Sequence, residues 1–215
     1  FKGYLQTDGY AGYNAACKTY GLTHLGCMDH LRRYFTDAKK AQPKSKLKGK
    51  ISKAEMAINK LQKLYAIERS IKDLTAAEKY QARQERSKPA LDEFKSWVDT
   101  NLCKVPHDSL TGKALTYAVN QWPKLIRYCD DGNLNISNIK AENAVRPFVV
   151  GRKNWLFADT PKGAKASATL YSLVETAKAN GLEPYEYFRV MLRRLPYAEN
   201  IKDIEALLPW NIDLA

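Results

Sequence analysis

The chain has 215 residues, of which 45% are hydrophobic and 27% are charged, and its 35 Lys and Arg residues against 23 Asp and Glu residues give a net charge of +12. This composition is typical of a globular protein with a hydrophobic core and excludes a disordered or fibrous chain. Its apolar runs are too short for a membrane-spanning helix, and its four scattered cysteines do not make a disulfide framework, so we expect a reducing cytoplasm. A surface this basic attracts polyanions, of which nucleic acid is the commonest in that compartment.

The first 41 residues alternate between strand and helix patterns. In order, they predict a strand over 3–8, a helix over 12–20 that ends at Gly21, a strand over 22–27, and a helix whose apolar face carries Leu31, Tyr34, Phe35 and Ala38. This order favours parallel pairing of the two strands through a right-handed crossover. Ligands of such sheets bind beyond the carboxyl ends of the strands, which is where Asp8 stands.

The middle of the chain carries only helical patterns. One long helix is indicated by Ala54, Ile58, Leu61, Tyr65 and Ile71, and another by Leu91, Phe94, Val98 and Leu102. We interpret residues 42–108 as a helical insertion, within which residues 54–102 are closer to neutral and form an ordinary solvated helix surface. Residues 109–160 then return to the core, with a helix over Leu110 to Trp122 that Pro123 kinks or replaces by a new turn, and a later helix that starts at Ser137.

The last part of the chain predicts a basic turn and further helices. Gly151 to Ala158 indicates a basic turn that leads into a short apolar segment, and Val145 and Val149 are expected beneath the preceding helix. Residues 161–215 predict a helix that ends near Gly181, a second helix opened by Pro184, and a short tail over 196–215. The inward positions of the second helix are expected to be Tyr187, Phe188, Met191, Leu192 and Leu195.

Basic residues concentrate in two segments. Arg32 to Lys53 holds nine basic residues and one acid, and a second concentration extends from Lys140 to Lys165. If the fold brings them together, they form one track for a phosphate backbone. The run from Lys44 to Lys50 is equally compatible with a solvated loop that contacts nothing.

Two carboxylates are candidates for metal chemistry. Asp8 follows a predicted strand, and Glu142 lies on a predicted helix between Lys140 and Arg146. Divalent ions that assist phosphodiester chemistry need oxygen ligands that converge, although an Asp and a Glu chosen at random are more often surface residues. Cys27 and His30 have the spacing of half a zinc site, but no second pair completes it, so packing roles are the better interpretation.

Several segments together resemble the insertion-sequence-sixty-six family of bacterial transposases. They are residues 5–14 (LQTDGYAGYN), 26–35 (GCMDHLRRYF), 141–147 (AENAVRP), 151–157 (GRKNWLF), 170–178 (LYSLVETAK) and 207–211 (LLPWN). The resemblance covers nearly the whole chain, with the segments in the family's order.

The resemblance implies a helix-dominated α/β fold, namely the C-terminal portion of a ribonuclease-H-like domain with a long helical insertion. In such Asp-Asp-Glu enzymes three carboxylates bind two Mg²⁺ ions, which assist DNA cleavage and strand transfer. Asp8 matches the second acid and Glu142 the third, so both are expected to be catalytic and to bind metal. DNA phosphates are expected to contact the basic residues of the motifs, which are Arg33, Arg146, Arg152 and Lys153.

The resemblance also predicts the organisation of the chain. Residues 1–41 correspond to the strand and helix half that carries the second acid, 42–108 to the insertion, 109–160 to the return with the third acid, and 161–215 to C-terminal helices and a tail. Its expected partners are insertion-element ends and target DNA, further copies of the chain assembled on DNA, and accessory proteins of the same element. The expected location is the bacterial cytoplasm, in association with the nucleoid.

Two departures from the family pattern affect the expected activity. The family's first Asp precedes the segment that begins with Phe1, so we expect an incomplete catalytic core, and the family's Asp-Asn-Asn is replaced by Ser137, Asn138 and Ile139. A catalytically incomplete DNA-binding remnant is therefore the alternative to an active transposase part. A basic helical module that binds RNA is a third possibility, and it would show no preference for insertion ends.

Overall fold

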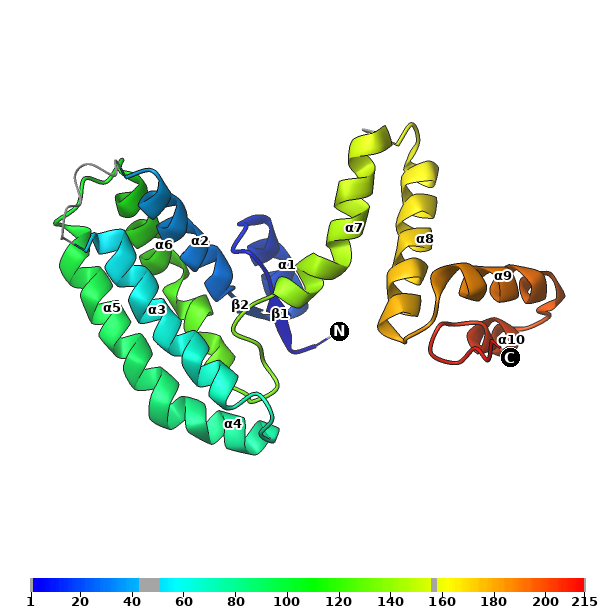
Figure 1. Ribbon diagram of the computed structural model, residues 1–215, viewed down its shortest axis with the longest axis horizontal. Coiled ribbons are helices and arrows are strands. Elements are labelled where there is room, and N and C mark those ends of the chain that lie inside the picture. The colour runs from blue at the N-terminus through cyan, green and yellow to red at the C-terminus, as the bar shows by residue number, and fades with distance from the viewer. Residues whose placement is uncertain (1, 43–50, 156–157, 215) are drawn as a thin grey trace. The chain divides into compact units, whose positions relative to one another are not determined.

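The computed structural model describes residues 2–42, 51–155 and 158–214 (Figure 1). Helices dominate it, as the sequence predicts, and the chain divides into a first unit, Phe1–Lys140, and a second unit, Ala141–Ala215. The basic run from Lys44 to Lys50 lies outside the described residues. The four-part division drawn from the resemblance stays a prediction.

A two-stranded parallel sheet opens the first unit. Strand β1 (Tyr4–Gln6) pairs with β2 (Thr23–Leu25), in a register that places Tyr4 opposite Thr23 and Gln6 opposite Leu25. Helix α1 (Gly12–Tyr20) forms the crossover and ends at Gly21, whose φ of 63° is the left-handed conformation that glycine adopts without strain. The predicted parallel pairing is confirmed, although both strands are shorter than predicted.

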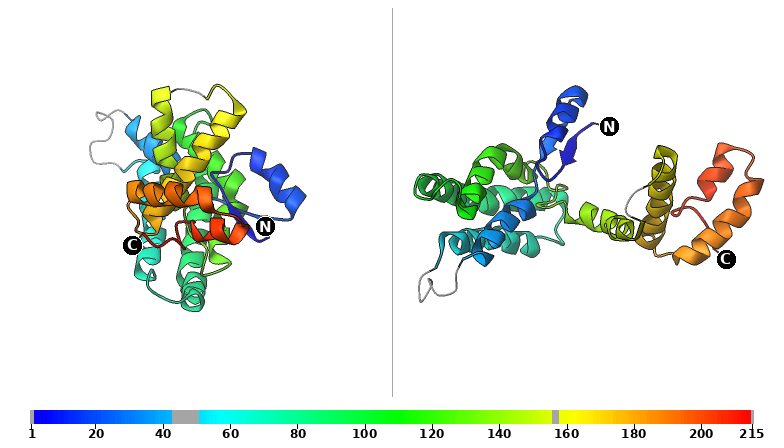
Figure 2. Two further views of the ribbon diagram at one scale, coloured as in Figure 1. Left: turned by 90° about the vertical axis from the view of Figure 1, so that its right-hand side faces the viewer. Right: turned by 90° about the horizontal axis from the view of Figure 1, so that it is seen from above.

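A bundle of helices makes up the rest of the first unit. It consists of α2 (Met28–Lys40), α3 (Lys53–Ser70), α4 (Ala76–Ala82), a π-helical turn (Arg83–Ser87), α5 (Lys88–Leu102), α6 (Leu110–Leu125) and a 3-10 turn (Ile126–Cys129). Helices α2, α3, α5 and α6 pack side by side (Figure 1, Figure 2). Their apolar faces enclose a core whose members include Leu31, Phe35, Leu61, Phe94 and Leu115, each at most 1% exposed. This core fixes the helices from which the candidate site is built.

Hydroxyl side chains begin three helices of this bundle. Ser52, Thr75 and Ser109 each accept a hydrogen bond from a backbone N–H in the first turn of α3, α4 and α6, which satisfies a donor that has no partner within the helix. Helix α6 continues through Pro123 and ends at Leu125, so Pro123 lies inside the helix and does not begin a new one. The 3-10 turn that follows accommodates the backbone beyond the proline.

The second unit contains most of helix α7 (Ile139–Trp155), followed by α8 (Pro161–Ala179), α9 (Pro184–Arg194), a 3-10 turn (Leu195–Tyr197) and α10 (Ile201–Ala206). The predicted turn at residues 151–158 is wrong over its first part, since α7 continues to Trp155; Leu156 and Phe157 lie outside the described residues. Val145 and Val149 are 56% and 45% exposed, not buried as expected. Helix α7 instead contacts α8 through Phe148, whose ring meets that of Tyr171 edge to face at 5.2 Å.

A small core holds the C-terminal helices together. Ala177, Tyr187, Met191 and Leu207 form it, and the Tyr187 hydroxyl donates to the Leu207 carbonyl at 3.1 Å. The helix start at Pro184 is confirmed, whereas Leu192 and Leu195 are 56% and 41% exposed and not inward as predicted. The predicted tail contains α10. Because this core buries only one stripe of α9, Tyr185 and Leu192 remain exposed, while Phe188 is half-buried against the core.

Candidate functional site

Asp8 lies just beyond the carboxyl end of β1, in a turn that its own neighbours hold. Its Oδ1 accepts the Tyr10 N–H at 3.0 Å, and its backbone carbonyl accepts the Tyr117 hydroxyl at 2.9 Å. The Tyr34 ring stacks on that of Tyr117 at 4.5 Å, and burial raises the pKa of Tyr117, so its hydroxyl remains a donor. The Asp8 side chain is exposed, yet these contacts limit where its carboxylate can point.

The buried side chain of His24 stabilises the turn at Asp8 through hydrogen bonds. His24 Nε2 lies 2.6 Å from Thr7 Oγ1, and its Nδ1 lies 3.2 Å from Asn14 Oδ1, which also accepts from Lys124 Nζ at 2.9 Å. Because the Asn14 oxygen can only accept, Nδ1 of His24 carries the proton and Nε2 accepts from the Thr7 hydroxyl. Thr7 Oγ1 in turn accepts the backbone N–H of Gly9 at 3.3 Å. The network thus holds the residues on both sides of Asp8.

The environment of His24 favours its neutral form. Burial lowers the pKa of His24 from its ordinary value of 6.5, and the positive charges of Lys124 and Arg127 lower it further, while the negative charge of Asp8 opposes them. A neutral ring is the form that the Thr7 hydrogen bond requires. His24 therefore serves the turn as a hydrogen-bonding element, and protonation would remove the acceptor that Thr7 uses.

We expect acid to weaken the fold through His24. Below pH 6.5 the unfolded chain takes up a proton at this residue before the folded chain does, so the stability that neutral His24 contributes is complete above pH 6.5 and decreases as the pH falls below it. The His24→Gln variant should lose part of this dependence when urea unfolding is compared at pH 7.5 and pH 5.5. The matched control is His107→Gln, at an exposed position. Equal pH dependence in the parent and the His24 variant would contradict the assignment.

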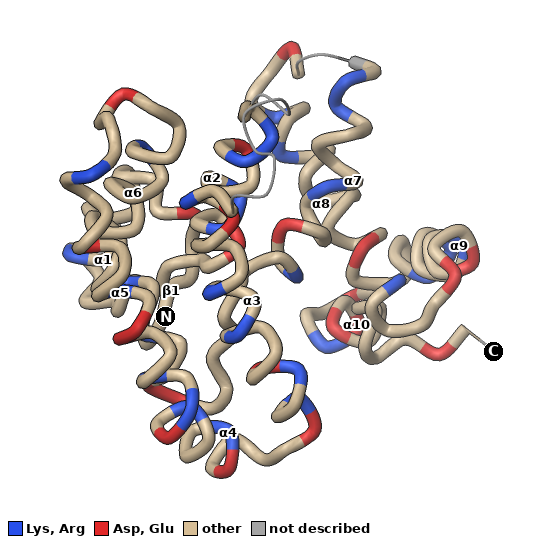
Figure 3. Tube along the Cα trace, turned by 60° about the vertical axis from the view of Figure 1, so that its left-hand side comes forward, with Lys and Arg blue, Asp and Glu red and all other residues tan. Residues whose placement is uncertain are grey.

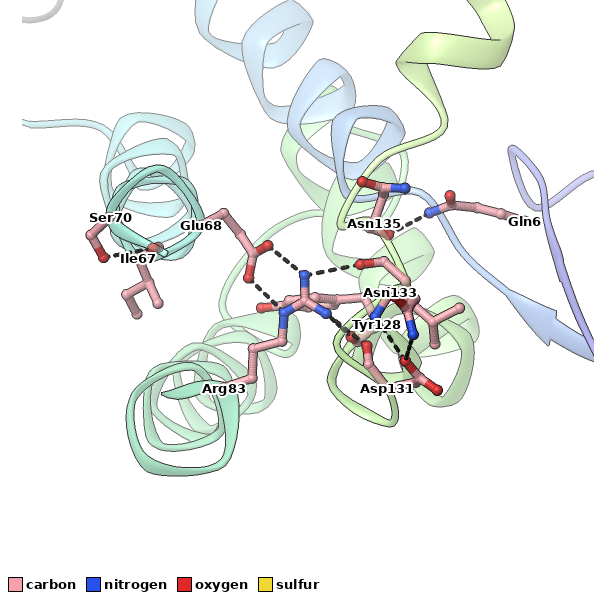
Figure 4. A network of polar contacts seen from close by, with 10 residues as sticks. Gln6, Ile67, Glu68, Ser70, Arg83, Tyr128, Asp131, Asn133 and Asn135 are labelled. Atoms are coloured by element: carbon pink, nitrogen blue, oxygen red, sulfur yellow. Dashed lines mark hydrogen bonds and ion pairs between the residues drawn. The ribbon is translucent and has the colours of Figure 1, made fainter. Parts of the chain in front are cut away.

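The segment that leads into α7 is tied to the sheet. Gln6 Nε2, at the end of β1, donates to the Gly26 carbonyl at 3.1 Å. It also donates to the Asn135 carbonyl at 2.8 Å (Figure 4). The Met28 N–H donates to the Ile136 carbonyl at 3.0 Å. The strand that precedes Asp8 and the loop that precedes Glu142 therefore lie side by side within the first unit.

Asp29 fixes the beginning of α7. Its carboxylate accepts the Tyr65 hydroxyl at 2.5 Å and also the Ser137 hydroxyl, and Ser137 Oγ accepts the Ile139 N–H at 3.1 Å. Burial, together with the hydrogen bond and charge of Asp29, raises the pKa of Tyr65. Helix α7 begins at Ile139, directly after the predicted start at Ser137 and Asn138, and the helical insertion supplies Tyr65 to brace Asp29.

Arg83 joins the helical insertion to the same loop (Figure 4). Its guanidinium contacts both carboxylate oxygens of Glu68, at 3.0 and 2.7 Å. Its other N–H groups donate to the carbonyls of Tyr128, Asp131 and Leu134 at 2.8, 2.8 and 2.9 Å. All five donors of the side chain are thereby used. The sequence does not single out this residue, because a buried arginine has the same helical spacing as a solvated one.

The predicted basic residues lie on two helices. Helix α7 carries Arg146, Arg152 and Lys153, all exposed, while Arg33 is exposed on α2. Figure 3 marks the Lys and Arg positions along the trace in blue. Glu142 lies in the first turn of α7 and is half-buried. The spacings of four and seven residues place Glu142, Arg146 and Lys153 on one face of α7, where a phosphate group could meet both kinds of charge.

The two predicted acids belong to different units, Asp8 to the first and Glu142 to the second. Their convergence on one site stays a prediction. Carboxylate oxygens have the chemistry that Mg²⁺ requires, and Asp8 offers an exposed, oriented carboxylate, so the two acids fit as ligands of such an ion. Within the described ranges, no group of three or more His, Cys, Asp or Glu side chains forms a complete ligand set.

The remaining sequence candidates have structural roles or none. Cys27 is fully buried, and its Sγ lies 3.8 Å from Ser137 Oγ, which agrees with packing as the interpretation of the Cys27 and His30 pair.

In the part of the chain that the structure describes, no helix combines the length and the apolar character that crossing a bilayer demands.

Comparison with known proteins agrees with the family resemblance seen in the sequence. The model of the family described as "Transposase IS66 family" matches residues 1–166, and that of the "IS66 C-terminal element" matches residues 172–210. No solved structure matches the chain.

Relatives of uncharacterised function occur in Sinorhizobium fredii strain NBRC 101917 / NGR234. The chain is 33% identical to uncharacterized protein y4qI, over 98% of its own length and 39% of that protein. It is 31% identical to uncharacterized protein y4hP, over 98% of its own length and 40% of that protein. The chain thus spans about two fifths of the length of these curated relatives. Since family models cover most of its residues, the chain belongs to the IS66 family of transposases.

Proposed function

We propose that this chain is part of the catalytic region of a transposase that cleaves and joins DNA at the ends of an insertion element. Family membership supports the reaction class. The observation that carries the proposal is the contact of Gln6 with Asn135, because it joins the strand that precedes Asp8 to the loop that precedes Glu142. A ribonuclease-H-like arrangement, in which acids from a strand end and a later helix converge, accounts for this contact.

Asp8 and Glu142 are the proposed catalytic residues and the proposed ligands of Mg²⁺. When bound, such ions activate the attacking oxygen and stabilise the leaving oxygen of a phosphodiester. The chain's own part is to orient Asp8 through the Tyr10 N–H and the Tyr117 hydroxyl, and to start α7 through Ser137.

The basic residues Arg33, Arg146, Arg152 and Lys153 are proposed to bind the phosphates of the DNA. On α7, Arg146 and Lys153 share a face with Glu142, so they would neutralise phosphates beside the scissile bond. We further propose that the protein acts on the nucleoid as an oligomer assembled on DNA, together with accessory proteins of its element.

The test is a nicking assay with the full-length protein. We expect strand cleavage at insertion-end sequences in supercoiled plasmid when Mg²⁺ is present, and none when EDTA removes the ion or when the end sequence is scrambled. DNA binding without cleavage under any of these conditions would favour a catalytically incomplete remnant. Binding of RNA in preference to DNA would contradict the proposal.

A further inference from the structure

The first unit contains a basic hollow that is lined by neither Asp8 nor Glu142. It has a volume of about 520 Å³ and lies between the C-terminal end of α3, helix α4 and the loop at residues 132–136. Residues on its wall include Tyr65, Arg69, Lys72, Lys79, Asn133 and Lys140. Side chains from α3, α4 and α7 therefore contribute cations to one concave surface.

The positive charge of this hollow is not balanced by its own wall. Glu68 is the only carboxylate among the lining residues, and Arg83 occupies both of its oxygens. Lys72 lies 3.7 Å from the Asp73 carboxylate, with both side chains highly exposed. Within the described part of the chain, Arg69, Lys79 and Lys140 have no ion-pair partner. Three unpaired cations thus surround a neutral, hydrogen-bonded floor.

The floor of the hollow is rigid where it meets Arg83. That guanidinium holds the carbonyls of Asp131 and Leu134, so the loop that carries Asn133 cannot easily move away from α4. Gly132 lies so close to α4 that a Cβ added to it would meet the Ala76 carbonyl oxygen at 1.8 Å. The wall thus presents its cations from segments that are held in fixed positions.

We infer that this hollow binds backbone phosphates of the DNA on which the transposase acts, so that the helical insertion is part of the DNA-binding surface. The inference rests on the proposed function. Lys and Arg side chains around a concave surface suit phosphate oxygens, which carry charge but no sequence information. Lys140 stands two residues before Glu142 on α7, so a residue of the hollow and a proposed metal ligand are near neighbours in the sequence.

The experiment compares two triple variants of equal charge. The hollow variant is Arg69→Gln, Lys79→Gln and Lys140→Gln, and the control is Arg86→Gln, Lys88→Gln and Lys113→Gln, whose positions are exposed in the same unit but do not line the hollow. Affinity for a fluorescent DNA duplex is measured by anisotropy between 50 and 200 mM salt, without divalent ions. We expect the hollow variant to bind about tenfold more weakly near 0.1 M salt, and its salt slope to fall by about 2 to 3.

Each result decides between the proposals. If the hollow variant binds like the parent, or if both variants lose the same affinity, this inference is overturned while the proposed function stands. If the parent binds no DNA, both fail. A loss confined to RNA would assign the hollow to a different ligand. Should the triple variant melt below the parent, Lys79→Gln alone should still reduce the salt slope by about 1, against no change for Lys88→Gln.

Discussion

Asp8→Asn is expected to abolish Mg²⁺-dependent nicking of insertion-end DNA by the full-length protein. Asparagine has nearly the same shape and can still accept the Tyr10 N–H, but it lacks the negative charge that a divalent ion needs. Loss of a metal ligand removes several kcal/mol of transition-state stabilisation, which corresponds to a rate decrease of about a thousandfold or more. Glu142→Gln should have an effect of the same order for the same reason.

The controls for this prediction are Asp92→Asn and Glu85→Gln, which make the same chemical changes at exposed positions of α5 and the π-helical turn. They should nick DNA at the rate of the parent. DNA affinity measured in EDTA should be unchanged or slightly higher in the Asp8 and Glu142 variants, because each removes one negative charge. Nicking at the parent's rate by both of these variants would show that the acids are wrongly assigned.

Arg83→Met should strongly destabilise the first unit. The Arg83 side chain is 3% exposed, and that of its partner Glu68 is 16% exposed. Without the guanidinium, a largely buried carboxylate and three backbone carbonyls lose their donors. Removing one partner of a buried ion pair typically costs about 3–5 kcal/mol, and we expect a loss of this size in urea unfolding followed by circular dichroism.

Two further variants separate charge from geometry at this position. Arg83→Lys keeps the charge but cannot supply five donors in one plane, so most of the loss should remain. The double variant Arg83→Met with Glu68→Leu removes the unpaired carboxylate and should recover part of the stability, but not all, because the three carbonyls stay unsatisfied. Full stability of Arg83→Met would mean that the network seen around it contributes little.

Short sequence patterns predicted the elements whose conformation is set by residues adjacent in the sequence. The alternation over residues 3–8 and the strand pattern over 22–27 identified both strands, and Gly21 marked the end of α1, where it adopts a left-handed conformation. The start of α9 at Pro184 was also readable, since proline at the first helical position loses no hydrogen bond. These features depend on a few neighbouring residues.

Features that depend on distant partners could not be predicted in this way. Gly151 and the basic residues after it have the composition of a turn, but α7 continues through them to Trp155. Nothing adjacent to Arg83 distinguishes it from a solvated arginine, since its partners are residues of α3 and of the loop after α6. For the same reason, the sequence does not predict the hydrogen bonds that His24 and Tyr117 make to the turn at Asp8. The acids themselves were identified by resemblance, not by spacing.

The side chain of Gln6 has a consequence for how such proteins can diverge. It contacts Gly26 and Asn135, which lie on either side of the helical insertion in the sequence. The segment between them contains α2, the helical insertion and α6, and both of its ends contact one amide group, so a change of length within the insertion leaves these two contacts of Gln6 in place. Relatives with insertions of very different size should therefore still keep a side chain at this position that can bridge two carbonyl groups.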